Sequence, residues 1–276
     1  MNSRGIITQV DINDYLDSRW ELVRDLLNPE TKKKQRSEEI GREYDDELYG
    51  PLLKQYREDK AALWLRILAP EELEVVISLG ESELVRTSYA TYQWMRQGKF
   101  VSVLKKYHDR DRICELGAGY GQNLIVLESL LRAKTYGGEL SKNAIELGNL
   151  HGLEIHPFNF CEPKSYEFIT PGSTLFTHHA IEQVPDATAW IESLRAIRDR
   201  IGYVVQFEPM YRPERTGMLG RLRNRYAEIN DYSQNLLSLL EADGEITVHE
   251  VEPDLYGLNP FNPTSLMVWS FKGSVA

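Results

Sequence analysis

The sequence has few cysteines and no clustered metal ligands. Only Cys114 and Cys161 occur among its 276 residues, and both lie in apolar, strand-like surroundings that predict buried free thiols. Two such residues do not predict the disulfide framework of a small secreted domain. No cysteine and histidine residues stand at the spacing of a zinc site, so we predict no metal and a reducing, cytoplasmic location.

Long hydrophobic runs and excess positive charge are also missing. No apolar stretch is long enough to span a bilayer, and the start of the chain, MNSRGIITQVD, lacks the apolar core of a signal peptide. The chain has 32 Lys and Arg against 42 Asp and Glu, a formal net charge of −10. Because negative charge repels phosphate backbones and anionic lipids, we predict neither nucleic acid nor membrane as a partner. The expected partner is a small molecule. The sequence does not decide whether the chain forms a homodimer.

What is present is the composition of an ordinary globular protein. Hydrophobic residues make up 42% and charged residues 27% of the chain, both usual values for a globular domain. A chain of this length buries one large core, so we expect one main domain with a smaller attachment.

The most informative segment is the glycine-rich turn Glu115–Gly121, with the sequence ELGAGYG. It follows a short apolar run and precedes a segment with leucines at helical spacing. Glycines at alternate positions between a strand and a helix let backbone N–H groups approach a ligand closely. Glu139 stands 18 residues past Gly121, at the end of the next strand-like segment. In a parallel α/β sheet, an acidic residue at that place meets the hydroxyls of a ribose.

The spacing of these glycines separates classes of ligand. A dinucleotide-binding turn has the pattern G-x-G-x-x-G, whereas this chain has G-x-G-x-G with Gln122 at the place of the third glycine. No Lys-Ser or Lys-Thr pair follows directly, so a phosphate-binding loop is not predicted. Glu115 would repel a phosphate and attract an ammonium group. Two alternative functions use the same fold: a nicotinamide-dependent oxidoreductase and a non-catalytic cofactor-binding module. A third alternative is that the turn is only tightly packed and binds no ligand.

The sequence ELGAGYG followed by Glu139 resembles the class I S-adenosylmethionine-dependent methyltransferases, of the kind that act on small molecules. The resemblance runs from about residue 110 to the C-terminus. It implies a Rossmann-like α/β fold with a seven-stranded, mostly parallel sheet and an antiparallel last strand. It also implies S-adenosyl-L-methionine as the cofactor. The binding residues that it implies are Glu115, Gly117, Ala118, Gly119, Tyr120, Gly121, Glu139, Leu140, Asn159, Phe160 and His178.

The resemblance also implies what these residues do. The turn would wrap the methionine part of the cofactor, and Glu139 would bind the ribose. Asn159 would bond the adenine amino group and Phe160 would pack on the ring, although an Asx turn leaving the strand is an alternative for Asn159. An aromatic residue or Arg86, from the last helix before the sheet, would meet the methionine carboxylate or sulfonium, with a plain core position as the alternative.

The chain divides into two parts at about residue 100. Residues 1–100 are expected to form a helical lid or substrate-binding region, and residues 101–276 the cofactor-binding domain. In the first part, helices are predicted over residues 12–27, 51–68, 70–79 and 82–97, with an exposed helix or mobile connection over residues 30–47. In the second part, residues 210–241 are expected to be an insertion near the acceptor pocket. Its arginines would bind an acidic acceptor or form a solvated face.

From residue 110 onward, short strand patterns alternate with helical ones, which predicts a parallel sheet. Strands are expected over residues 112–115, 135–139, 153–157, 174–177 and 203–207. Helices are expected between them over residues 121–131, 141–151 and 186–199, and a final strand pair over residues 245–252 and 265–271.

Three polar residues near the carboxyl ends of strands are candidates for catalysis. His178 and His179 follow the fourth predicted strand, at the edge where open α/β sheets bind ligands, and histidine has a pKa suited to taking a proton near neutral pH. Glu208 closes the fifth strand and would orient the base. The alternatives are one histidine hydrogen-bonded in the core with the other in solvent, and Glu208 capping a turn or pairing with Arg212 or Arg215.

These features predict transfer of a methyl group from S-adenosyl-L-methionine to a nitrogen or oxygen atom of a small molecule. Natural-product, amino-acid or guanidino, and sugar-like acceptors all fit. A hydroxyl acceptor would need a histidine base, whereas an amine or guanidino acceptor would need carboxylates such as Glu182 and Glu208. The sequence leaves the acceptor open.

Overall fold

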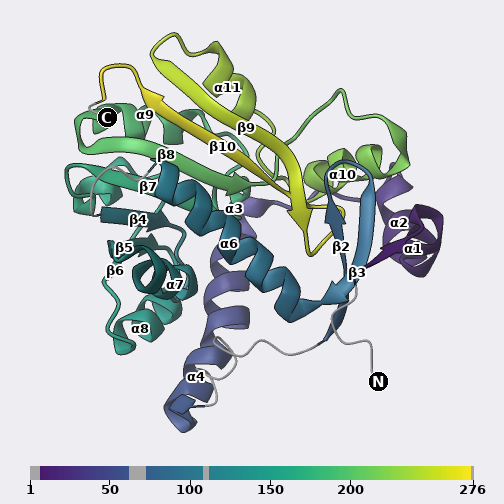
Figure 1. Cartoon of the computed structure of the whole chain (residues 1–276), viewed down its shortest axis with the longest axis horizontal. Helices are drawn as coiled ribbons and strands as arrows, with labels where there is room; N and C mark the ends of the chain where they lie inside the picture. Colours follow the sequence, from purple (N-terminus) through teal and green to yellow (C-terminus); the bar gives the residue numbers. More distant parts are fainter. Residues whose placement is uncertain (1–6, 62–72, 108–111, 275–276) are drawn as a thin grey trace.

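The computed structural model of the chain describes residues 7–61, 73–107 and 112–274. Its centre is a ten-stranded sheet with the strand order β1-β3-β2-β9-β10-β8-β7-β4-β5-β6 (Figure 1). The predicted fold class, an α/β protein with a mostly parallel Rossmann-like core, is confirmed. The sheet is larger than the seven strands predicted, because three further strands extend one side of it.

Five adjacent strands form the parallel half of the sheet: β4 (Arg112–Leu116), β5 (Lys134–Glu139), β6 (Ile155–Pro157), β7 (Ser173–His178) and β8 (Ile201–Glu208). Strand β4 lies in the middle, where Cys114 stands opposite Tyr136 of β5 and Leu175 of β7. Nearly every residue of β4 and β7 is buried, as expected for strands covered on both faces. All five predicted strands are confirmed.

Helices cover both faces of this parallel half. They are α6 (Tyr89–Tyr107), α7 (Gln122–Leu131), α8 (Lys142–Leu150) and α9 (Thr188–Ala196). Helices α6 and α7 share one buried cluster with the sheet, which includes Phe100, Leu127 and Phe176. Helix α9 belongs to the other large cluster, in which Trp190 packs edge-on against Trp269. The three helices predicted between the strands are confirmed as α7, α8 and α9.

Two antiparallel strands continue the sheet beyond β8. They are β9 (Ile246–Gly257) and β10 (Thr264–Phe271), and β10 lies between β8 and β9 with antiparallel pairing to both. The predicted antiparallel last strand is therefore confirmed. The order β6-β5-β4-β7-β8-β10-β9 is that of a methyltransferase-like Rossmann fold.

Three strands from the N-terminal part extend the sheet past β9. They are β1 (Thr8–Val10), β2 (Glu74–Leu79) and β3 (Glu83–Ser88). The helix predicted over residues 70–79 is wrong where the structure describes it, from residue 73, and the helix predicted over residues 82–97 is wrong up to residue 88. Val75, Val76 and Ile77 are β-branched and favour a strand, and Gly80 at φ +63° supplies the tight turn to β3.

The N-terminal helices are α1 (Ile12–Ser18), α2 (Trp20–Leu27), α3 (Arg36–Gly41), the π-helix η1 (Arg42–Tyr49) and α4 (Gly50–Glu58). The helix predicted over residues 12–27 is confirmed with a break at Arg19, and Asp11 caps its start through the Asn13 N–H at 2.8 Å. The helix predicted over residues 51–68 is confirmed as far as α4, and its residues 62–68 lie outside the described part. We call residues 36–58 the strap.

The segment between β8 and β9 holds α10 (Gly217–Ile229) and α11 (Leu236–Ala242), and three short 3-10 helices complete the described chain: η2 (Pro163–Phe168), η3 (Ile181–Gln183) and η4 (Arg198–Arg200). Helix α10 packs on α2 in a separate buried cluster that includes Leu26 and Leu222. Figure 1 shows α2 and α10 at the far end of the sheet from β4–β6.

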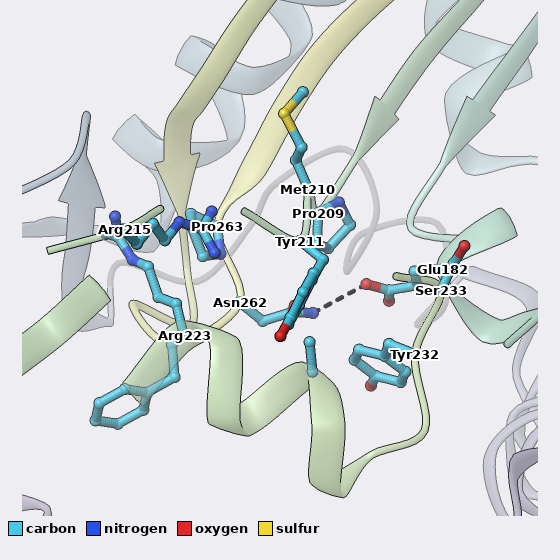
Figure 2. A pocket seen from close by; sticks show the side chains of 12 residues that line it. Glu182, Pro209, Met210, Tyr211, Arg215, Arg223, Tyr232, Ser233, Asn262 and Pro263 are labelled. Atoms are coloured by element: carbon cyan, nitrogen blue, oxygen red, sulfur yellow. Dashed lines mark hydrogen bonds between the residues drawn. The ribbon is translucent and has the colours of Figure 1, made fainter. Parts of the chain in front are cut away.

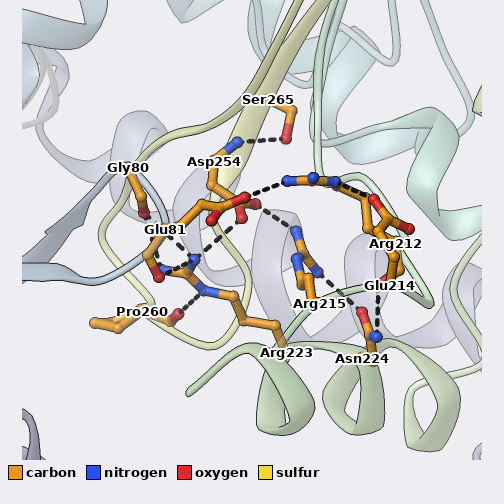
Figure 3. A network of polar contacts seen from close by, with 10 residues as sticks. All are labelled: Gly80, Glu81, Arg212, Glu214, Arg215, Arg223, Asn224, Asp254, Pro260 and Ser265. Carbon is orange, nitrogen blue, oxygen red and sulfur yellow. Dashed lines mark hydrogen bonds and ion pairs between the residues drawn. The ribbon is translucent and has the colours of Figure 1, made fainter. Parts of the chain in front are cut away.

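Buried ion pairs join α10 to the extended sheet (Figure 3). Asp254 of β9 is fully buried and pairs with Arg215 and with Arg223, the latter at 3.1 Å. Arg223 also donates to the carbonyl oxygens of Glu81 at 2.9 Å and Pro260 at 3.0 Å. These two arginines of the insertion therefore serve the fold and do not form a solvated face.

Candidate cofactor and active site

A cavity of about 400 Å³ opens at the carboxyl ends of the parallel strands, a usual size for a small-molecule site. Four segments of the sheet edge line it: Gly117; Glu139 and Leu140; the run Phe158–Cys161; and His178, His179 and Ala180 with Gln183–Pro185. The strap lines it with Ile40, Tyr44 and Tyr49. The structure thus brings most of the predicted site residues to one place.

The glycine-rich turn has a shape that only glycine can adopt at its key positions. Gly117, Gly119 and Gly121 all have left-handed backbones, with φ of +77°, +56° and +86°. A Cβ atom on Gly117 would lie 2.4 Å from the Cβ of Ala180, which is closer than two carbon atoms can approach. The missing side chain therefore lets the turn and the loop after β7 meet at the cavity wall. Ala118 and Tyr120, also predicted to bind the cofactor, lie in the same turn.

Glu115 lies beneath the turn at the end of β4 and is 1% exposed. Its Oε1 accepts a hydrogen bond from Asn123 at 2.7 Å, whereas its Oε2 is buried with no partner among the described residues. Burial raises the pKa of Glu115 to about 8. An unpaired buried acceptor at this place fits the predicted contact with an ammonium group.

Glu139 joins the end of β5 to the glycine-rich turn. Its Oε2 accepts from the Gly119 N–H at 2.8 Å, and its Oε1 accepts from the N–H groups of Leu140 and Ser141, both at 2.8 Å. Burial raises the pKa of Glu139 above its usual value. A carboxylate has about four acceptor positions, so these three bonds leave room for about one hydroxyl donor from the cavity.

The segment after β6 forms the third wall. Asn159 Oδ1 accepts from the Cys161 N–H at 2.9 Å, so the alternative of an Asx turn is confirmed. The same oxygen has a second lone pair, so the turn does not prevent a contact with adenine. Phe160 stands edge-on to Phe158, with ring centroids 4.8 Å apart. Cys161 is exposed, and the prediction that it is buried is wrong, because it lies in this turn beyond the strand and not within it. Cys114 is buried as predicted.

His178 is the last residue of β7 and lines the cavity. Its Nε2 atom is buried and has no hydrogen-bond partner among the described residues. The ring stands edge-on to Phe100 at 5.0 Å. Burial, followed by the positive charges of His179 and Arg96, holds the pKa of His178 well below its usual value. The imidazole is therefore neutral at neutral pH, with a nitrogen available to accept a proton or a hydrogen bond.

His179 differs from its neighbour because both of its ring nitrogens are engaged. Nδ1 lies 3.3 Å from Glu182 Oε1, and Nε2 lies 2.7 Å from Thr264 Oγ1. Its backbone is left-handed at φ +50°. Burial would lower the pKa of His179, but the charge of Glu182 and the hydrogen bond to it raise the pKa above the usual value. Of the predicted alternative, the hydrogen-bonded histidine is found at His179, whose side chain is 26% exposed. Its other half is wrong, because neither histidine points freely into solvent.

Glu208 is fully buried at the end of β8, and it does not line the cavity. Both carboxylate oxygens accept from the Ala180 N–H at 3.0 Å, and Oε2 accepts from the Glu182 N–H at 3.3 Å. Glu208 therefore fastens the loop that follows the two histidines, and the alternative of a turn cap is confirmed. Burial, with the charge of Glu182, raises the pKa of Glu208 to about 7.

The alternative that Glu208 pairs with Arg212 or Arg215 is wrong. Arg212 pairs with Glu81 and with Glu214, each at 2.7 Å. Arg215 pairs with Asp254 in the network of Figure 3.

Glu182 connects this loop to the turn between β9 and β10. Figure 2 shows its carboxylate facing Asn262, whose Nδ2 donates to Oε2 at 3.0 Å. Gln183 donates to the other oxygen at 2.9 Å. Beside Glu182 lies a second cavity of about 10 Å³, lined by Tyr211 and Tyr232 among others, which has space for about one water molecule. The cavity that fits a cofactor is therefore the larger one.

The strap was not predicted to reach the site. The charged run 30–47 was expected to be exposed or mobile, yet Asp45 binds the start of α8 through Ser141 Oγ at 2.6 Å and the Asn143 N–H at 2.9 Å. The Tyr49 hydroxyl stands against Gly119, 2.6 Å from where a Cβ atom would lie. Burial and the charge of Glu139 hold the pKa of Tyr49 well above its usual value. The only early signal was the tyrosines within this acidic run.

Arg86 does not reach the cavity. It lies on β3, where its side chain is 48% exposed and pairs with Glu74 of β2 at 2.6 Å. Within the described ranges, no group of three metal-ligating side chains occurs, and no helix combines the length and apolar character needed to cross a bilayer.

Comparison with known proteins gives structural likenesses only. No family model matches the sequence, and no curated protein matches it. The structure is similar to that of the pyocyanin biosynthetic protein PhzM, with 16% identity and a TM-score of 0.47 over 62% of this chain and 54% of PhzM, about half of its length.

Two further solved structures are similar at equally low sequence identity. The mitomycin 7-O-methyltransferase MmcR is 16% identical with a TM-score of 0.48, over 91% of this chain and 67% of MmcR. The geranyl diphosphate C-methyltransferase from Streptomyces coelicolor A3(2) is 14% identical with a TM-score of 0.47, over 63% of this chain and 78% of the enzyme. Sequence identities this low carry over no residue role. By its strand order the chain has the methyltransferase-like Rossmann fold, and its structure resembles those of several S-adenosylmethionine-dependent methyltransferases.

Proposed function

We propose that the chain is an S-adenosylmethionine-dependent methyltransferase that methylates a nitrogen or oxygen atom of a small molecule. One observation carries the proposal. A cavity at the carboxyl ends of the parallel strands adjoins the glycine-rich turn and is lined by Glu139, Asn159 and the neutral His178. When bound, S-adenosyl-L-methionine supplies an electrophilic methyl group.

In this proposal the residues that line the cavity hold the cofactor together with Glu115, which lies beneath the glycine-rich turn and does not itself line the cavity. The unpaired Oε2 of Glu115 accepts from the ammonium group, and the remaining acceptor position of Glu139 takes a ribose hydroxyl. Asn159 meets the adenine edge and Phe160 its face, next to Leu140. Gly117 and its neighbours bring the backbone close to the methionine part.

His178 is the proposed general base. Its unpaired Nε2 takes the proton from the acceptor hydroxyl or amine, because the imidazole is neutral at neutral pH and lines the cavity. His179 and Glu208 act through the loop. Glu208 fixes the backbone at Ala180, and His179 ties the same loop to Thr264. We assign both to positioning, which changes their predicted role from catalysis.

The strap excludes water in this proposal. Tyr44 and Tyr49 of the strap line the cavity together with residues of the sheet edge. We further propose that residues 1–100 serve as the lid and substrate-binding region and residues 101–276 as the cofactor-binding domain, although strands β1–β3 belong to the same sheet. The part of segment 210–241 nearest the acceptor would be its start, beside Glu182 in Figure 2.

Titration calorimetry tests the proposal first. We expect saturable binding of S-adenosylhomocysteine and no binding of NADH. Binding of NADH alone would support the nicotinamide-dependent oxidoreductase, and the Gln122 position argues against it. Mass spectrometry of ligands that copurify with the protein would then identify acceptor candidates.

A non-catalytic module is the remaining alternative, and turnover separates it from an enzyme. Release of labelled S-adenosylhomocysteine should occur with at least one compound of a panel of phenols, sugars, amines and guanidino compounds. Tight nucleoside binding with no turnover over the whole panel would support the module.

A further inference from the structure

Asp45 of η1 fastens the strap to the start of α8. Its Oδ1 accepts from the Ser141 hydroxyl at 2.6 Å and from the Asn143 N–H at 2.9 Å, and its carbonyl oxygen accepts from Asn143 Nδ2 at 3.0 Å. Burial would raise the pKa of Asp45, but the hydrogen bonds from Asn143 and Ser141 lower it below its usual value. The carboxylate is therefore ionised at neutral pH, and hydrogen bonds to a charged acceptor are the stronger ones.

Ser141 connects this contact to the cavity. Its hydroxyl donates to Asp45 and also accepts from the Ala144 N–H at 3.1 Å, so it caps α8. Its own N–H donates to Glu139 Oε1 at 2.8 Å. Glu139 lines the cavity, whereas Asp45 is not one of the lining residues. Ser141 therefore lies between a carboxylate of the strap and a carboxylate of the cavity, and it bonds to both.

The strap also touches a second residue that holds Glu139. Oε2 of Glu139 accepts from the Gly119 N–H at 2.8 Å. The Tyr49 hydroxyl stands against Gly119, 2.6 Å from where a Cβ atom would lie, and the Tyr49 ring is edge-on to Tyr120 with centroids 6.2 Å apart. Tyr49 follows Asp45 by four residues on η1. The strap therefore contacts a donor residue for each oxygen of the Glu139 carboxylate.

The charge of Asp45 does not itself favour an ionised Glu139. Burial raises the pKa of Glu139, and the negative charge of Asp45 adds to that rise, because like charges repel. What Asp45 supplies is position. Its hydrogen bonds fix the Ser141 side chain and hold η1 against α8, and the same segment places Tyr44 and Tyr49 at the cavity.

We infer that Asp45 is a positioning residue for the nucleoside site: it holds the strap at the cavity and, through Ser141, keeps the Glu139 carboxylate in place. This inference rests on the proposed function, in which Glu139 takes a ribose hydroxyl. Asp45 acts through Ser141 and does not itself touch the nucleoside. A bound nucleoside and a docked strap then stabilise each other, because both need the same arrangement of Ser141 and Glu139.

The first experiment measures the binding kinetics of S-adenosylhomocysteine. We expect Asp45→Ala to weaken binding about tenfold, the size of one charged hydrogen bond, mainly through faster dissociation. Asp45→Asn should recover part of the loss, because its amide oxygen still accepts from Ser141 and Asn143. Unchanged binding in Asp45→Ala would overturn the inference.

Two variants control for the loss of charge and for the loss of another contact between the strap and α8. Asp46→Ala removes the same side chain at the next, exposed position of η1. Arg57→Met breaks an ion pair with Glu146 of α8, and both side chains of that pair are about half exposed, so it contributes little. We expect both variants to bind S-adenosylhomocysteine like the wild type. A loss in either as large as in Asp45→Ala would overturn the inference.

A double-mutant cycle tests the connection through Ser141. Ser141→Ala removes the hydroxyl that donates to Asp45 and keeps the N–H that donates to Glu139. If Asp45 acts through this hydroxyl, Asp45→Ala should weaken binding less than about threefold in the Ser141→Ala background. A loss of about tenfold in both backgrounds would mean that the two residues act independently, and the inference would be wrong.

Hydrogen exchange in the ligand-free chain separates this inference from the proposed function. The amides of residues 42–58 should exchange about fivefold faster or more in Asp45→Ala than in the wild type, while those of the parallel strands stay unchanged. No change in the strap would mean that Asp45 does not hold it, and an equal rise over the whole chain would mean a role in the fold; either result overturns the inference. If no nucleoside binds to the wild type or any variant, the proposed function fails, and exchange in the strap alone then decides whether Asp45 positions it.

Discussion

Two buried arginines of this molecule differ in how many hydrogen bonds the protein makes to them. Arg223, in the region where α10 meets β9, donates from all three guanidinium nitrogens, to Asp254 and to the carbonyl oxygens of Gly80, Glu81 and Pro260. Arg96, beside the cavity, has two buried nitrogens without a partner in the described chain. Burial is nearly complete for both, so burial alone does not separate the two side chains. They differ in how many hydrogen bonds the protein makes to the guanidinium.

The contrast extends to the neighbours of the two arginines, although Arg215 Nε in the α10 region is also buried without a partner among the described residues. In the α10 region, the Asp254 carboxylate binds two arginines. Around the cavity, Glu115 Oε2 and His178 Nε2 are also left without partners in the described part of the chain. Unpaired buried groups lower stability, and proteins retain them where a ligand completes them. The cavity region is therefore expected to gain more from a ligand than the α10 region.

The largest expected effect comes from making the same substitution in both regions. Arg223→Met leaves Asp254 with one partner fewer and removes the hydrogen bonds to three backbone carbonyl oxygens, so the free energy of unfolding should fall by about 3–5 kcal/mol. Arg96→Met should change it by less than about 1 kcal/mol or raise it. Urea unfolding of the two variants measures the difference. Equal losses would remove the distinction between the regions.

His178→Ala should have the next largest effect, on turnover rather than on stability. Loss of the proposed base should slow methyl transfer to a hydroxyl acceptor about 100-fold or more, while S-adenosylhomocysteine still binds. Single-turnover measurements on an acceptor found in the panel check this. His179→Ala is the comparison, because its ring nitrogens are both bonded to protein and its loss should reduce stability as well. Full activity in His178→Ala would exclude it as the base.

Gly117→Ala tests whether the glycine-rich turn at the cavity tolerates a side chain. The new Cβ would lie 2.4 Å from that of Ala180, on a backbone with φ +77°, so we expect a loss of about 2 kcal/mol and no nucleoside binding. Gly152→Ala is the matched control, because Gly152 has φ +81° but nothing within 4 Å of the added atom. It should cost about 1 kcal/mol from backbone strain and leave binding unchanged. Calorimetry and unfolding together measure both quantities.

The smallest expected effect is a pH dependence of stability from Glu115. Its pKa is raised from 4.5 to about 8 in the folded chain, so the folded state holds a proton that the unfolded state releases. Its contribution is complete below pH 4.5 and is lost as the pH rises to about 8. Glu115→Gln cannot lose a proton, so it should be more stable than the wild type at pH 8 by about 1 kcal/mol or more. Parallel pH profiles for the two chains would contradict this.

The parallel half of the fold was predictable because its signals are local. The apolar run of β4, the spaced glycines after it and the acid at the end of β5 all lie within Arg112–Glu139, so one stretch of sequence contains a complete strand–turn–helix–strand unit. Strands β2 and β3 were missed because their apolar residues also fit a helix. What selects the strand is the β-branched content of β2 and pairing with β9, for example Leu79 with Tyr256, which is distant in sequence.

The strand pattern predicted which histidines lie at the cavity, but not which polar groups are already bonded within the protein. That His178 and His179 both reach the cavity follows from the strand pattern. That His179 is already occupied depends on Thr264, which lies 85 residues away, and the role of Glu208 depends on backbone groups 28 and 26 residues before it. Arg96 gave no sequence signal, because only the folded structure reveals that its charge lacks a partner.

The outermost strands of the sheet are its shortest. Both β1 and β6 are three residues long, and β6 ends in a proline, which has no N–H group to offer. A sheet whose rims expose so few unpaired backbone groups gives an incoming strand little to attach to, so edge-to-edge aggregation is discouraged. Self-association by strand pairing at the described edges of the sheet is therefore disfavoured.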